Sequence, residues 1–187
     1  MRAILSEEQK RSLMQVAHES LRAAVTGAPP PDLTTDDPVL LEPRGAFVTL
    51  KTHDQLRGCI GYVEPRVPLI EAVADNARSA ALHDPRFTRV LPEELPDIEI
   101  EISALTPLRP VKSAEEIEVG RHGLMICCGF NRGLLLPQVP VEWGWDREEF
   151  LEHTCLKAGL HPDSWRRPEA ELLCFEAEVF GEDTPGQ

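Results

Sequence analysis

A strictly alternating segment in the middle of the chain places the strongest constraint on its fold. Residues 98–103 (IEIEIS) carry isoleucine at every second position and a polar residue at the others. Because successive side chains of a β-strand point to opposite faces, this pattern predicts a strand with one buried and one open face. Such strands are typical of antiparallel sheets that are covered by helices on one side only.

The other periodic segments complete an α+β pattern. Helices are predicted to start at Ser6 and Asp146, which open capping boxes, and at Pro68. Further strands are predicted at 46–51, 56–62, 124–128, 134–139 and 171–180. We expect a mostly antiparallel sheet flanked by helices. The 187 residues fit one domain, 1–187, which leaves room for a small lobe within about 53–95.

Composition narrows the functional class. A net charge of −13, from 19 basic and 32 acidic residues, argues against nucleic-acid binding, which depends on neutralising phosphates. The five cysteines are odd in number and show neither disulfide nor zinc-ligand spacing. No apolar run approaches the roughly 20 residues of a membrane helix, and the N-terminus lacks a signal-peptide pattern. We expect a cytoplasmic protein with free thiols, no membrane association, no metal and no cofactor.

Residues 56–61 (LRGCIG) hold the most reactive combination in the chain. In an extended segment Arg57 and Cys59 share a face, and a guanidinium beside a thiol favours the nucleophilic thiolate. Gly58 and Gly61 allow a ligand or another part of the backbone to approach closely. The alternative interpretation is a small apolar side chain on a buried strand.

A nucleophilic thiol needs a base and donors for developing negative charge. We expect His83 to be the base, ahead of the other histidines, because it lies in a non-helical junction beside Asp84 and near Arg86. Backbone N–H groups around Gly58 and Ile60 could act as donors. Alternatively, His83 is a solvated helix end, and Asp84 only begins a turn at the following proline.

Two later segments contain further candidates. The turn at residues 120–123 (GRHG) would bind an anion through Arg121 and His122 if it faces a cleft, and is otherwise a glycine-rich turn. Gln138 lies in an apolar run, where a buried amide must be paired or must contact a ligand. The alternative is that Gln138 satisfies a bulge created by Pro137.

The chain resembles the AMMECR domain family along nearly its whole length. Residues 45–50 (GAFVTL) and 56–61 resemble the family signature, and its later motifs are matched in order at 84–87, 101–105, 120–124, 133–139 and 150–159. The bacterial and archaeal branch is called AmmeMemoRadiSam system protein A, whose gene tends to occur with those of a Memo-like protein and a radical SAM protein. The resemblance implies an α+β fold with a larger and a smaller lobe and a cleft between them. It leaves the reaction open.

Two functional hypotheses follow. The first is a cytosolic enzyme or accessory enzyme with Cys59 and His83 as catalytic residues and a substrate-binding set of Arg57, Arg86, Arg121, His122 and Gln138. The second is a non-catalytic module that binds a peptide, or a loop of a Memo-like or radical SAM protein. In that case residues 98–103, if they form a sheet edge, would add a strand of the partner.

Overall fold

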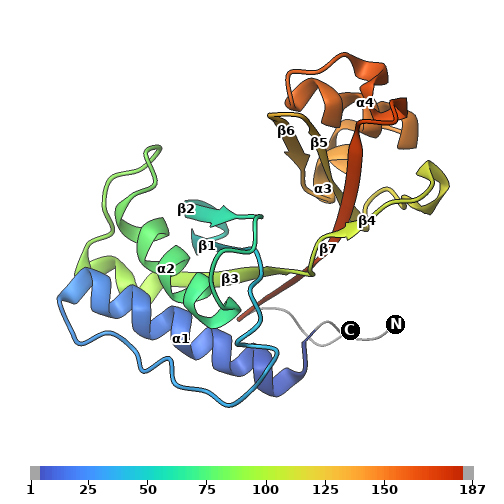
Figure 1. Cartoon of the computed structure of the whole chain (residues 1–187). Helices are drawn as coiled ribbons and strands as arrows, with labels where there is room; N and C mark the ends of the chain where they lie inside the picture. The colour runs from blue at the N-terminus through green and yellow to red at the C-terminus, as the bar shows by residue number, and fades with distance from the viewer. Residues whose placement is uncertain (1–4, 183–187) are drawn as a thin grey trace. The chain divides into compact units, whose positions relative to one another are not determined.

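The computed structural model describes residues 5–182, which form two compact units (Figure 1). The first unit spans Met1–Leu105 and Glu178–Gln187, and the second spans Thr106–Ala177. Both combine helices with antiparallel strands, so the predicted α+β class is confirmed. The segment 53–95, where the sequence suggested a small lobe, lies within the first unit, and the second unit begins later in the chain.

The first unit packs two long helices on one face of an antiparallel sheet. Its elements are α1 (Glu7–Thr26), β1 (Ala46–Thr52), β2 (Gln55–Tyr62), α2 (Leu69–Leu82), η1 (Pro92–Asp97) and β3 (Ile98–Leu105). The strand order is β2-β1-β3, with β7 (Glu171–Gly181) next to β3. Val48, Leu50, Ile100 and Ile102 are at most 1 % exposed, on the face that α1 and α2 cover (Figure 1). The alternation in residues 98–103 therefore predicted this core face correctly.

Local signals explain where these elements begin and turn. Ser6 caps α1 through a capping box with Gln9, as predicted. The β1–β2 hairpin turns through His53 and Asp54, whose φ angles of 51° and 61° are the left-handed values of a two-residue type I′ turn. That turn matches the right-handed twist of the two strands. A bulge between Leu50 and Lys51 then shifts the register, so that Leu50 pairs with Gly58 and Arg57 is skipped. The register pairs Thr49 with Cys59 and Val48 with Ile60.

The second unit is a smaller sheet with short helices. It contains β4 (Arg109–Pro110), η2 (Ala114–Glu116), β5 (His122–Cys128), β6 (Asn131–Leu135), α3 (Gln138–Trp143), α4 (Arg147–Lys157), η3 (Pro162–Arg166) and most of β7. The strand order is β7-β5-β6, and β4 pairs with β7. Phe150 and Leu151 of α4 pack with Leu124 and Cys174 in its core.

Two sequence predictions differ from the structure. The strand expected at 134–139 ends at Leu135, because Pro137 has helical angles (φ −58°, ψ −32°) and precedes helix α3, which Gly144 ends in the left-handed conformation. The strand of residues 98–103 lies between β1 and β7. It is not a sheet edge, so it cannot accept a partner strand.

Candidate functional site

The face of the first sheet opposite the helices carries a row of polar side chains. Cys59 on β2 pairs with Thr49 on β1, which pairs with Glu101 on β3. The Thr49 hydroxyl donates to the Cys59 sulfur at 3.3 Å, and Lys51 Nζ lies 2.7 Å from Glu101 Oε2. Cys59 is partly exposed. The thiol therefore has a polar environment, and the interpretation of Cys59 as a purely apolar core residue does not hold.

The loop after α2 secures the outer edge of β2 at Cys59. The Cys59 N–H donates to Asp84 Oδ2 at 2.8 Å, and Arg86 Nη2 donates to the Cys59 carbonyl at 3.3 Å. Arg86 also donates to both carboxylate oxygens of Asp84, at 3.0 and 2.8 Å. β2 is the last strand of the sheet order on this side, and these two side chains take the place of a neighbouring strand at this residue.

This arrangement places the Arg86 guanidinium at the backbone of Cys59. Asp84 is buried, yet the hydrogen bonds from Arg86, together with the Cys59 N–H, hold the pKa of its carboxyl well below the usual range. The pKa of Arg86 is raised, chiefly by its hydrogen bond to Asp84 and further by the charge of that carboxylate. A positive charge close to a thiol favours its nucleophilic form.

Arg57, which was predicted to serve the thiol, has other partners. Its Nε and Nη2 donate to the two oxygens of Glu94 at 2.7 and 3.0 Å, and its guanidinium also reaches the carbonyls of Thr88 and Arg89. The ion pair raises the pKa of Arg57 and lowers that of Glu94. Arg57 thus holds residues 88–94 against β2, and its guanidinium is already paired with groups of the same unit.

The prediction for Gly58 and the prediction for the backbone N–H groups have different outcomes. A Cβ on Gly58 would lie 2.3 Å from the Ala80 carbonyl oxygen, so Gly58 allows close packing of β2 on α2, as its lack of a side chain suggested. Since the Cys59 N–H points to Asp84, the alternation of an antiparallel strand directs the N–H groups of Gly58 and Ile60 toward β1. They are therefore part of the sheet and do not serve as donors for a substrate.

His83 lies beside the site without contacting the thiol. It is the exposed residue at the C-terminal end of α2, and together with Asp84, Phe87 and Arg89 it lines a shallow depression of about 730 Å³. Within residues 5–182, the hydrogen bonds of Cys59 run to Thr49, Asp84 and Arg86 and do not include His83. This matches the alternative interpretation of His83 as a solvated helix end.

The other three predicted residues belong to the second unit. Arg121 forms ion pairs with Glu118 and Glu176, both at 3.1 Å. His122 is 2 % exposed, accepts the Glu118 N–H at Nδ1 (3.0 Å), and has its pKa lowered, mainly by burial. These contacts close the turn before β5. Gln138 is exposed at the start of α3, so the requirement for a buried amide partner does not arise.

Sequence reasoning missed Thr49 and the partner of Arg57. Thr49 is an ordinary residue of a predicted strand, and only the hairpin register places it opposite Cys59. A two-residue turn at His53 and Asp54 gives the pairing only as far as Lys51 with Leu56, because the bulge that follows shifts it by one residue. Neither turn residue is the glycine or asparagine that marks such turns most clearly. Glu94 lies 37 residues from Arg57, which no local pattern connects.

Two kinds of feature are absent from the part of the chain that the structure describes. Among residues 5–182 there is no group of three or more His, Cys, Asp or Glu side chains placed to bind a metal ion. The helices within that range lack the length and apolar character that crossing a bilayer requires.

Comparisons with known proteins agree with the fold and with the sequence motifs. The chain is 48 % identical over 188 residues to a protein of Methanothermobacter thermautotrophicus, covering 97 % of this chain and 98 % of the relative. It is 54 % identical over 155 residues to protein MK0488 of Methanopyrus kandleri, covering 78 % and 75 %. The crystal structure of the uncharacterized protein PH0010 from Pyrococcus horikoshii matches with a TM-score of 0.78 and 40 % identity, over 98 % of this chain and 96 % of that one. The family model described as AMMECR1 matches residues 14–180, and the chain belongs to the AMMECR1 family.

Proposed function

We propose that this chain is a cytosolic enzyme or accessory enzyme in which Cys59 is the nucleophile and Arg86 holds an anionic group of the substrate. The observation that carries the proposal is the surroundings of one partly exposed sulfur. Thr49 donates a hydrogen bond to it, and the half-exposed guanidinium of Arg86 donates to the backbone carbonyl of the same residue. A cation close to a thiol favours its nucleophilic form.

The contacts favour addition to an electrophilic carbon over transfer chemistry that needs a histidine base. When the thiol adds to a carbonyl group, a bond forms between the sulfur and the carbonyl carbon, and the C=O π bond opens. The proton of the thiol ends on the former carbonyl oxygen, so no further reactant is needed. Thr49 donates to the sulfur and Arg86 to the carbonyl of the same residue, and both groups are suited to stabilise negative charge that develops during the addition.

A pair of alkylating reagents that differ only in charge tests the roles of both residues. Iodoacetate and iodoacetamide each form a bond from sulfur to their CH₂ carbon with loss of iodide. We expect Cys59 to have a higher iodoacetate-to-iodoacetamide rate ratio than the partly exposed Cys128, because Arg86 attracts the carboxylate. Arg86→Gln should lower the ratio at Cys59 about threefold or more without changing it at Cys128. Quantitative peptide mass spectrometry reports each cysteine separately.

Arg89→Gln is the matched control, since Arg89 is an exposed arginine of the same loop and contacts Arg57 through its backbone carbonyl oxygen. The control should leave the ratio at Cys59 unchanged. Arg86 would have no place in the proposed site if the iodoacetate-to-iodoacetamide rate ratios of Cys59 and Cys128 were equal. The same would follow if Arg86→Gln and Arg89→Gln changed the ratio at Cys59 equally.

A second candidate function is a binding module for Memo-like and radical SAM proteins, the partners that the family resemblance implies. The observation in its favour is a group of exposed apolar side chains in the second unit, with Phe130 fully exposed, Trp143 at 69 % and Val141 at 59 %. Such residues are enriched at interfaces. We expect Phe130→Ser and Trp143→Ser to weaken co-purification with such partners at least tenfold while Cys59→Ala leaves it intact. The reverse pattern would discard the module and favour the thiol.

A further inference from the structure

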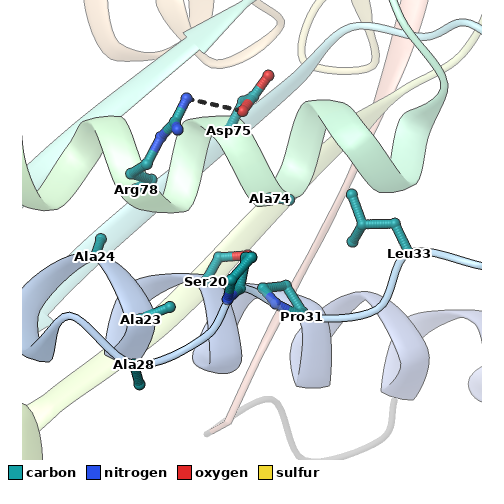
Figure 2. A pocket seen from close by; sticks show the side chains of 10 residues that line it. Ser20, Ala23, Ala24, Ala28, Pro31, Leu33, Ala74, Asp75 and Arg78 are labelled. Carbon is teal, nitrogen blue, oxygen red and sulfur yellow. Dashed lines mark hydrogen bonds and ion pairs between the residues drawn. The ribbon is translucent and has the colours of Figure 1, made fainter.

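Two surface depressions of the first unit differ in what they lie beside. The first is bounded by α1, by α2 and by the proline-rich connection after α1, and its charged lining residues, Asp75 and Arg78, pair with each other at 3.1 Å (Figure 2). It shares no residue with the polar row at Cys59. The second is the shallow depression of about 730 Å³ lined by residues between 82 and 91, which we call the loop depression. It is the one of the two with a residue that contacts Cys59, because Asp84 lines it and accepts the Cys59 N–H.

Two residues of the loop depression connect it to the candidate site. Asp84 accepts the Cys59 N–H at 2.8 Å and pairs with Arg86. Phe87 also lines the depression, and the centre of its ring lies 5.5 Å from the guanidinium carbon of Arg86. Arg86 in turn donates to the Cys59 carbonyl, and its side chain is more than half exposed. The same guanidinium therefore borders the backbone of Cys59 and a ring that lines the depression.

The chain that forms the loop depression is bound to β2 at two places. At one end, Asp84 accepts the Cys59 N–H. At the other, Arg57 donates to both carboxylate oxygens of Glu94 and to the carbonyls of residues 88 and 89. Because both ends are held by the same strand, the depression is formed before a ligand arrives, as is usual for small-molecule sites.

Much of the lining of the loop depression is apolar. It includes the side chains of Leu82, Pro85, Phe87 and Leu91. Leu91 is 59 % exposed and Phe87 is partly exposed, so both present apolar surface to a ligand. Small-molecule sites combine such apolar walls with a few polar groups that fix orientation. Between this wall and Cys59, that polar group is the exposed guanidinium of Arg86.

We propose that the loop depression binds the apolar part of the substrate that Cys59 attacks, and that this substrate is an organic anion with an aromatic body. The inference rests on the proposed function of Cys59 and Arg86 and adds the class of substrate. The anionic group pairs with Arg86, the electrophilic carbon lies at the sulfur, and the aromatic ring packs on Phe87 and Leu91. A ring is favoured over an alkyl chain because aromatic pairs gain from their geometry beyond the area they bury.

Two alkylating reagents that differ by one benzyl group test the apolar contact. Iodoacetamide and N-benzyl-iodoacetamide both form a bond from sulfur to their CH₂ carbon, with loss of iodide and of the thiol proton. The rate ratio of the benzyl reagent to iodoacetamide should be about fivefold higher at Cys59 than for glutathione, because the ring leaves water on Phe87 and Leu91. Leu91→Ser should remove most of this gain and leave the iodoacetamide rate unchanged.

Leu41→Ser is the matched control for the loss of an exposed leucine. Leu41 belongs to the same unit and is 46 % exposed. The carbonyls of the residues on either side of it accept the N–H groups of Leu69 and Ile70 at the start of α2. The loop depression follows the other end of that helix. The control should therefore keep the gain of the benzyl reagent at Cys59.

Phenylacetate and acetate test binding without an alkylation step, since they share a carboxylate and differ by a phenyl ring. Phenylacetate should shift the amides of Thr88 and Leu91 in ¹H–¹⁵N correlation spectra and should slow the alkylation of Cys59 by iodoacetamide. Acetate should need an about fivefold higher concentration for the same effects. Both Arg86→Gln and Leu91→Ser should weaken the binding of phenylacetate.

The substrate class and the proposed function of the thiol fail in different ways. If Cys59 reacts with iodoacetamide no faster than Cys128, the activated thiol is wrong, and the substrate class is wrong with it. If Cys59 is faster but the benzyl reagent shows no gain, or if Leu91→Ser keeps the gain, the loop depression alone is excluded from the site. Phenylacetate that fails to shift the amides, or that shifts them without slowing the alkylation, also overturns the inference.

Discussion

Substitution of Gly58 by alanine is expected to lower the free energy of unfolding of the first unit by about 3 kcal/mol, the upper part of the range for overpacking. The added Cβ would lie 2.3 Å from the Ala80 carbonyl oxygen and 3.2 Å from its carbonyl carbon. These are backbone atoms of α2, so no side-chain rotation can relieve the clash. β2 would have to separate from α2, and the row at Cys59 would shift with it. Urea denaturation followed by far-UV circular dichroism measures the loss, since α1 and α2 dominate that signal.

Gly27→Ala is the control for a glycine replaced in the same unit. Gly27 has a φ of 75° and no atom within 4 Å of an added Cβ, so only the cost of the left-handed backbone applies, about 1 kcal/mol. A Gly58→Ala variant no less stable than Gly27→Ala would show that the contact between β2 and α2 is looser than described.

Replacement of Asp84 by alanine is the second large effect, with an expected loss of about 3 kcal/mol at neutral pH, the upper part of the range for leaving a buried donor without its partner. The substitution leaves the Cys59 N–H without its acceptor and Arg86 without its counter-ion. The control is Asp75→Ala, since Asp75 is exposed and pairs with an arginine three residues later. That surface pair should contribute about 1 kcal/mol or less to the free energy of unfolding, as is usual for exposed ion pairs.

The effect of Asp84 should depend on pH in a defined direction. Its folded pKa is depressed, chiefly by Arg86, so its contribution is fully present above the pKa of an unfolded aspartate, about 3.9. The contribution is lost as the pH falls through the lower, folded value. The stability difference between the wild type and Asp84→Ala should therefore stay constant from about pH 8 to pH 5 and narrow below about pH 4. If the stability difference between the wild type and Asp84→Ala grew as the pH fell, the ion pair between Asp84 and Arg86 would be contradicted.

Sequence alone predicted the features of the fold that depend on neighbouring residues. The capping boxes at Ser6 and Asp146 and the alternation of residues 98–103 are local signals, and each marked its element correctly. Helix α3 was missed because six residues are too few to show helical periodicity, and because an apolar run ending in a proline resembles an irregular strand. The division into two compact units depends on contacts between distant segments, which no local pattern shows.

The candidate site shows the same division between local and distant information. Strand alternation places Gly58 against α2 and Cys59 on the opposite face, but Arg57 lies at the bulge of β2, where regular alternation is interrupted. Strand alternation could not show that Glu94 binds Arg57, or that Arg86 reaches back 27 residues to the backbone of Cys59. A charge pattern along the chain gives the candidates, and only the fold assigns them to partners.

The nucleophilic character of Cys59 is tested most directly by its rate constant for alkylation with iodoacetamide at neutral pH, measured beside that of Cys128 in the same molecule. With Thr49 and Arg86 in place, Cys59 is expected to react at least about tenfold faster than Cys128, and Arg86→Gln should remove most of that advantage. If Cys59 reacts no faster than Cys128, or if Arg86→Gln leaves its rate unchanged, the proposal of an activated thiol at this site is wrong.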